Sequence, residues 1–188
     1  MASSPATPSL AAIDQRYLGA WNEINTRIAL RQALITIYTS LTLASIGAPL
    51  LQASNSGLWR LAYAVPPLSV LFAMLLRMHE RMIRLLILYL IEWDVRSGAE
   101  PALCYFAGEW SAQVAKVRRS HDLVCLALVL GLNGIAGFVV FVGPRATELT
   151  FADHIACGVL ALVAGLALWL IWGIFTLRDP AMKTASRA

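Results

Sequence analysis

Residues 123–143 read LVCLALVLGLNGIAGFVVFVG, and this block contains no charged side chain. A helix needs about 20 predominantly apolar residues to cross the hydrocarbon core of a membrane. Three further apolar blocks of similar length cover residues 32–52, 58–76 and 155–177. The blocks are continuous apolar runs, which favour helices over strands of alternating polarity. The sequence therefore predicts an all-α membrane protein with four transmembrane helices.

The composition agrees with this class of protein. Hydrophobic residues make up 59% of the 188 residues and charged residues 14%. Soluble domains contain about 45–50% apolar and about 25% charged residues. Because the four blocks take up most of the chain, the remaining segments are too short for a separate soluble catalytic domain.

The positions of lysine and arginine predict the orientation in the membrane. Thirteen of the 15 basic residues lie before the first block, between the second and third blocks, or after the fourth. Only Arg60 and Arg145 fall elsewhere. Lys and Arg concentrate on the cytoplasmic side of membrane proteins. We therefore expect two helical hairpins with both termini in the cytoplasm, in the inner (plasma) membrane of a bacterium.

These assignments divide the chain into segments. Residues 13–177 form one transmembrane domain, in which residues 13–31 and 77–122 build a small cytoplasmic helical subdomain. Residues 1–12 are expected to be disordered, because they are rich in Ser, Ala and Pro. Residues 178–188 form a cytoplasmic tail. The two connections on the outer side read as short turns.

The cytoplasmic subdomain should continue the membrane helices. Residues 68–97 contain no Pro or Gly, so the second span is expected to run on without a break. Within this extension Glu80 and Arg84 are four residues apart, in the favourable order for an ion pair. Residues 85–91 are all apolar. They need cover from residues 14–31, residues 102–117, a second copy of the chain or the lipid headgroup zone.

Asn133 is the one strongly polar side chain deep in the third block. Small residues let helices approach closely, and an Asn can hydrogen-bond across helices. This pattern predicts a packing seam in the bundle, or alternatively a subunit interface or pore lining. The glycines assigned to this seam are Gly131, Gly134, Gly137, Gly158 and Gly165.

Pro66 and Pro67 are expected to kink the second span, because two backbone donors are missing in mid-helix. Such a kink is a static bend or a hinge. A further set of residues on the cytoplasmic side is the candidate interaction surface: His79, Arg81, Arg84, Leu88, Tyr89 and Trp110.

Chemistry-bearing motifs are absent from the sequence. It has no GxSxG, HExxH or phosphate-binding glycine loop, and its three cysteines show no metal-ligand spacing. The interiors of the four blocks hold no ionisable side chain, which argues against a proton-coupled transporter. We therefore expect no cofactor, no metal and no enzymatic activity. The basic cluster before the third block is explained by anionic lipid, and nucleic-acid binding is disfavoured.

The segment from His79 through Tyr89-Leu90 to Glu109-Trp110 resembles a family of small, uncharacterised bacterial four-helix membrane proteins. In that family a His begins a cytoplasmic helix, and a Tyr-Ile pair and then a Trp-Glu pair follow. The layout is also similar to membrane accessory or effector proteins of anti-phage systems. This second resemblance implies a protein that senses a cytoplasmic event and perturbs the membrane.

Three functions remain open at this stage. The first is a non-enzymatic membrane protein that self-associates and perturbs or gates the membrane in response to a cytoplasmic signal or partner. The second is a membrane anchor or assembly subunit that recruits a soluble cytoplasmic protein. The third is a small transporter or membrane enzyme. The partners implied are the lipid bilayer, further copies of the chain and a soluble cytoplasmic protein.

The charge distribution yields a topology prediction. Reporter fusions at Ala2, Ala99 and Ala188 should all report a cytoplasmic position, and a fusion at Ser56 should report the outside. Paired reporters active on opposite sides of the membrane measure this directly. An outside signal at Ala99 would contradict the two-hairpin arrangement.

Overall fold

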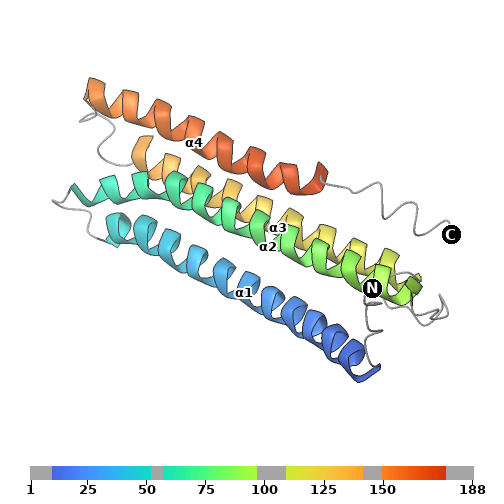
Figure 1. The fold of residues 1–188 in the computed structure, drawn as a ribbon. Coiled ribbons are helices and arrows are strands. Elements are labelled where there is room, and N and C mark those ends of the chain that lie inside the picture. The colour runs from blue at the N-terminus through green and yellow to red at the C-terminus, as the bar shows by residue number, and fades with distance from the viewer. Residues whose placement is uncertain (1–9, 52–56, 97–108, 142–149, 177–188) are drawn as a thin grey trace, which may run out of the picture.

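The structure is a computed structural model, which describes residues 10–51, 57–96, 109–141 and 150–176. This part of the chain is all-helical and contains no strand, as the apolar blocks predict. Its elements lie side by side in an elongated bundle (Figure 1). They are α1 (Leu10–Leu51), the 3-10 helix η1 (Gly57–Ala64), α2 (Val65–Arg96), α3 (Glu109–Phe141) and α4 (Phe151–Thr176).

Three of the helices are longer than a membrane span, because polar extensions continue the apolar blocks. α1 has 42 residues and includes both the amphipathic N-terminal stretch and the first apolar block. α2 runs unbroken to Arg96, as expected from the lack of Pro and Gly. α3 joins residues that were expected to be cytoplasmic to the third block. α1 begins at Leu10, three residues before the start expected for the folded part.

Three segments among the described residues are long and apolar enough to cross a membrane: Leu58–Asp94, Ser120–Phe141 and Asp153–Ile174. They support a membrane protein. The expected first span, residues 32–52, is not among them. It carries Thr and Ser at five positions, which lower its mean hydropathy, and the description of α1 ends at Leu51.

The start of α2 differs from the expectation for the two prolines. Pro66 and Pro67 are the second and third residues of α2, directly after η1, and do not lie in mid-helix. Proline is tolerated in the first turn of a helix, since the amide hydrogens there have no partner within the helix. The residues before α2 form the 3-10 helix η1. The prolines therefore lie in the first turn of α2, next to the junction between η1 and α2.

The first turn of α4 is closed by its own side chains. Asp153 Oδ2 accepts hydrogen bonds from the backbone nitrogen of Thr150 at 2.9 Å and from its hydroxyl at 2.7 Å. The Thr150 hydroxyl oxygen in turn accepts from the Asp153 amide at 3.3 Å. This reciprocal pair is a capping box with Asp in the Glu/Gln position, and it sets where α4 begins.

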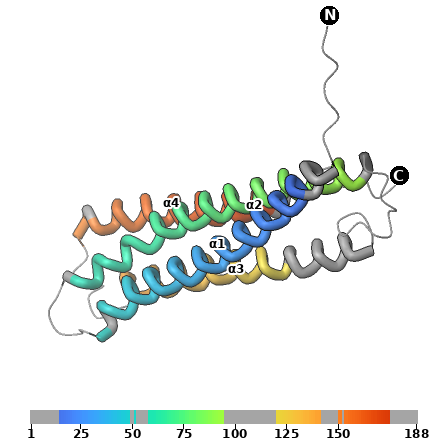
Figure 2. Tube along the Cα trace, turned by 60° about the horizontal axis from the view of Figure 1, so that its bottom comes forward, coloured from blue at the N-terminus to red at the C-terminus, as the bar shows by residue number. Residues whose placement is uncertain are grey.

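Helix α2 packs against α1 on one side and α4 on the other (Figure 2). The buried side chains form two clusters along the bundle. The larger cluster lies between the apolar blocks and includes Val65, Leu76, Val129 and Ile171, all fully buried. It fills the interior of the bundle with apolar side chains.

A second cluster joins the extensions of α1 and α2. Ala20 and Ile24 of α1 pack with buried side chains of α2, among them Ile87 and Leu90. Thus α1 covers one face of residues 85–91. On the opposite face Leu85 is 53% and Tyr89 39% exposed, so the described residues do not fully cover it. The side chains of residues 102–117, one of the expected covers, lie outside the described part of the chain.

Some expectations concern residues outside the described part of the chain. They are the disorder of residues 1–9, most of the two outer turns and the C-terminal tail. The end of the second outer turn is described, and it is helical: α4 begins at Phe151, four residues before the expected start of the fourth block.

Packing of α1 on α2 predicts a contrast between two leucines on one helix. Leu90 is fully buried in the second cluster, so Leu90→Ala should lower the free energy of unfolding by about 2–5 kcal/mol. Leu85→Ala is the matched control, and because that side chain is exposed it should cost less than about 1 kcal/mol. Thermal unfolding of the purified protein in one detergent compares them. Equal losses would mean that α1 does not cover this face.

Candidate functional site

Arg31 of α1 is the centre of a buried charge cluster. Its side chain is 8% exposed and reaches between α2 and α3. Nη1 donates to Glu80 Oε2 at 3.2 Å, and Nη2 donates to Asp122 Oδ1. Both carboxylates are buried as well. One guanidinium group therefore joins three helices through two charged hydrogen bonds.

The cluster extends to the fourth helix through Arg84. Nε of Arg84 donates to Glu80 Oε1 at 3.1 Å, and Nη2 donates to the backbone carbonyl of Ile174 at 3.0 Å. That carbonyl belongs to the last turn of α4, where helix carbonyls lack intrahelical partners and carry partial negative charge. The Glu80–Arg84 pair expected from the sequence thus also fixes the end of α4.

Among the described residues, the four charges of this cluster balance. Two arginines carry two positive charges, and Glu80 and Asp122 carry two negative charges when ionised. A buried ion pair is tolerated only when its charges are compensated and hydrogen-bonded, and removing one partner leaves an uncompensated charge that costs about 3–5 kcal/mol. The cluster is therefore stable only while all of its members stay in register.

His121 adds a group that can bind a proton. Arg31 Nη2 lies 2.9 Å from His121 Nδ1. Because a guanidinium group can only donate, Nδ1 must be the acceptor and the ring must be neutral. A second proton on this ring would occupy Nδ1 and break the contact with Arg31. His79 of α2 is buried, and its Nδ1 has no hydrogen-bond partner among the described residues.

A second group of polar side chains, linked by hydrogen bonds, lies in the apolar interior. The Ser69 hydroxyl donates to the Val65 carbonyl at 2.8 Å, so it accepts from the Tyr38 hydroxyl at 2.8 Å and from Asn133 Nδ2 at 2.8 Å. Asn133 Nδ2 also donates to the Val129 carbonyl at 2.8 Å. The side chains belong to α1, α2 and α3. The amide of Asn133 thus binds inside one chain, which is the bundle alternative predicted for it.

The glycines around Asn133 do not form a tight seam within the chain. A Cβ atom added at Gly131, Gly134, Gly137, Gly158 or Gly165 would meet nothing within 4 Å. The expected close backbone approach is therefore not made inside one copy. The smallness of these residues instead leaves space at the surface of α3 and α4.

The candidate interaction surface is only partly a surface. His79 is buried and Arg84 belongs to the charge cluster, whereas Arg81 and Tyr89 are exposed and Leu88 is half-buried. The side chain of Trp110 lies outside the described residues. His79 and Arg84 could not be told from surface residues because the sequence alone does not show which side of α2 faces α1 and α4.

Sequence reasoning missed Arg31 and Asp122 as a pair, although a signal was present. Each of them, like Glu80, lies within a few residues of an apolar block, at the end expected to be cytoplasmic. A two-hairpin topology brings these ends to one level, where opposite charges can meet. Among the described residues, no three His, Cys, Asp or Glu side chains come close enough together to hold a metal ion.

Comparisons of the chain with protein-family models, with curated proteins and with solved structures found no match.

The charge balance predicts how the cluster responds to substitution. Asp122→Asn removes one negative charge and should lower the free energy of unfolding by about 3 kcal/mol or more. Arg31→Leu combined with Asp122→Leu should recover most of this loss, because the remaining Glu80–Arg84 pair is neutral. Thermal unfolding in detergent compares both variants with the wild type.

Glu23→Gln is the control for this experiment. Glu23 pairs with Arg27 at 2.6 Å, but both side chains are partly exposed, 42% and 26% respectively. Exposed ion pairs contribute about 0–1 kcal/mol. A double variant less stable than Asp122→Asn alone would show that the cluster is held by something other than charge balance.

Proposed function

We propose that this chain is a non-enzymatic bacterial inner-membrane protein with four spans and both termini in the cytoplasm. It self-associates and perturbs or gates the membrane in response to a cytoplasmic signal or partner. The observation that carries the proposal is the Arg31 charge cluster, which joins all four helices at the level where α4 ends. The cluster lies between the apolar part of the bundle and the extensions of α1 and α2.

The hydrogen bonds of α1 support the proposal that this helix also crosses the membrane, in addition to the three segments that are apolar enough by composition. The hydroxyls of Thr36, Thr39, Thr42 and Ser45 each donate to the carbonyl four residues earlier, at distances of 2.7–3.2 Å. Hydroxyls paired in this way cost less in lipid than their hydropathy suggests. Leu41 and Leu43 are exposed on the same stretch and suit contact with lipid.

The lengths of the helices support a position of the cluster at an edge of the membrane. α4 has 26 residues and so spans about 39 Å, which is enough for the hydrocarbon core and part of the headgroup region. Its last turn binds Arg84, whereas α2 continues to Arg96 (Figure 1). The extensions of α1 and α2 therefore project beyond the bilayer on the side of the cluster.

This position makes the cluster a suitable coupling element. A partner that shifts the α1 and α2 extensions would move Arg31 and Glu80 relative to Asp122. Since a buried charge without its partner is strongly unfavourable, a small shift would favour a second arrangement of the spans. Buried ionisable side chains at the level of a membrane usually have a role of this kind.

Self-association is supported by what the single chain leaves uncovered. Leu162, Trp169 and Trp172 of α4 are more than half exposed, and Gly131 and Gly134 of α3 are exposed with open space around them. Small and apolar surfaces of this type permit contact between membrane helices. The interior of one chain is filled by the larger apolar cluster, so a conducting path would have to form between copies.

A membrane anchor is the second candidate function, and a separate observation favours it. Beyond the end of α4, helix α2 exposes Arg81, Leu85 and Tyr89. Tyr89 lies against Trp93, with ring centroids 6.3 Å apart. A mixed apolar, aromatic and basic surface at this place would suit a soluble protein that docks on the membrane.

The two functions predict different effects of opening the cluster. If the cluster holds a closed state, cells that express Asp122→Asn should lose membrane potential without any signal, while wild type stays polarised. The Arg31→Leu/Asp122→Leu variant should return towards wild type. A potential-sensitive dye measures this at equal amounts of protein in the membrane fraction.

Glu23→Gln serves as the control and should not change the potential. A normal potential with Asp122→Asn fully inserted would reject gating and leave the anchor function in its place.

A further inference from the structure

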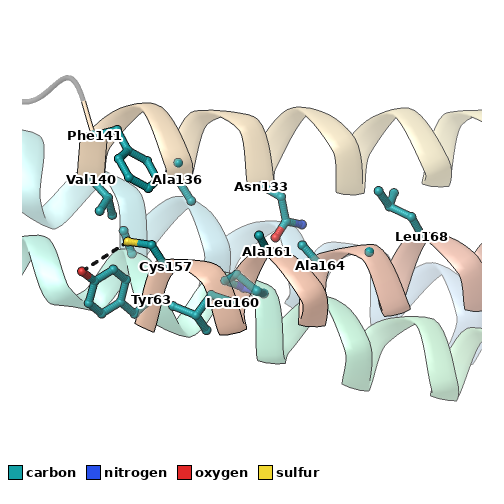
Figure 3. Close-up of a pocket in the computed structure, with 14 residues that line it drawn as sticks. Tyr63, Asn133, Ala136, Val140, Phe141, Cys157, Leu160, Ala161, Ala164 and Leu168 are labelled. Carbon is teal, nitrogen blue, oxygen red and sulfur yellow. Dashed lines mark hydrogen bonds between the residues drawn. The ribbon is translucent and has the colours of Figure 1, made fainter. Parts of the chain in front are cut away.

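A cavity of about 340 Å³ lies between the start of α2, α3 and α4 (Figure 3). Its walls are mostly apolar, and about half of the lining residues are small, among them Ala136 and Gly137 of α3 and Ala161 and Gly165 of α4. A Cβ atom added at either glycine would meet nothing within 4 Å. The volume is within the range of about 300–1,000 Å³ found for small-molecule sites.

Asn133 presents an unpaired acceptor to this cavity. Its Oδ1 is buried and has no hydrogen-bond partner among the described residues. In Figure 3 this oxygen points from α3 towards Ala161 and Ala164 of α4. A buried polar atom without a partner is unfavourable, and such atoms in native structures usually mark a missing ligand or water.

The orientation of the Asn133 amide follows from its neighbours. Nδ2 donates both to Ser69 Oγ and to the Val129 carbonyl, each at 2.8 Å. The Ser69 proton is already used on the Val65 carbonyl, so both atoms facing Nδ2 are acceptors. Exchanging oxygen and nitrogen would place Oδ1 against two acceptors. The amide oxygen is therefore held towards the cavity.

The surroundings decide which partner can satisfy Oδ1. A lipid acyl chain has no donor. A water molecule needs two to four polar partners, and the cavity wall near Asn133 is apolar. The other polar groups of the wall, the Tyr63 hydroxyl and the Cys157 thiol, are 3.7 Å from each other towards the η1 end (Figure 3). A molecule with an apolar body and one donor fits best.

We propose that this cavity binds a small, membrane-dissolved apolar molecule with one hydroxyl group, of the hydrophobic phenol or alcohol class. The hydroxyl donates its hydrogen bond to Asn133 Oδ1, and the apolar body occupies the space between the small residues of α3 and α4. This inference does not rest on gating, because it follows from the cavity and the amide alone.

The test uses two probes that differ only in the donor: 4-hexylphenol and its methyl ether, 4-hexylanisole. Binding to the purified full-length protein in lipid nanodiscs is measured from the rise in thermal stability with probe concentration in the lipid phase. The phenol should bind about tenfold more tightly than the ether, which corresponds to about 1.4 kcal/mol for the added hydrogen bond. Equal affinities in the wild type would overturn the proposal.

Three variants locate the site. Asn133→Leu should remove the preference for the phenol. Gly137→Leu fills the cavity and should abolish binding of both probes. Gly131→Leu is the matched control, since it places the same side chain on the same helix outside the cavity, also in open space. If Asn133→Leu does not fold, the two glycine variants decide, and equal binding by both would reject the cavity as the site.

Discussion

The arrangement of this bundle depends on the pairing of Arg31 with Glu80 and Asp122. The three side chains come from three helices, and Glu80 also holds Arg84, which binds the last turn of the fourth. Apolar packing alone fixes the register of the helices only weakly, because a helix can slide or rotate against its neighbours at modest cost in free energy. Buried charges fix the register more strictly, since each needs its partner within hydrogen-bond distance. Arg31, Glu80 and Asp122 are buried, and Arg84 is partly buried. The cluster thus sets the register of all four helices.

Polar contacts at other levels of the bundle add to this register. Ser69 receives hydrogen bonds from Tyr38 and Asn133, which fixes how α1 and α3 are rotated towards α2. Tyr38 also stacks on Phe72, with ring centroids 4.3 Å apart. Between these contacts the interior is apolar and adjusts to them. The small side chains of α3 and α4 cannot fill the space that results, and the cavity beside Asn133 is its consequence.

The proposed gating depends on the rigid polar contacts, and the proposed ligand site depends on the incomplete packing beside them. The charge cluster connects the ends of α1 and α2 to the apolar part of the bundle. In the proposed function it is the place where a cytoplasmic signal would reach the membrane-spanning part. The cavity is farther along the bundle, on the other side of Asn133. A molecule bound there would contact α3 and α4 and could act on the spans separately from the cluster.

The sequence by itself determined that the described part of the chain is helical and that three of its four apolar blocks are long and apolar enough to cross a membrane. It also determined that α2 continues beyond its apolar block. These properties are local, because they depend on runs of apolar side chains and on the positions of Pro and Gly. The Glu80–Arg84 pair could be predicted from the sequence for the same reason, because the two residues are four apart on one helix. Only the tertiary structure decided the partners of Arg31, since Asp122 lies 91 residues away in the chain. It also decided that Pro66 and Pro67 lie in the first turn of α2, and that Oδ1 of Asn133 has no hydrogen-bond partner among the described residues. These features depend on how each helix is rotated and shifted against the others. Each block carries apolar side chains on several sides, so the sequence alone does not select one rotation.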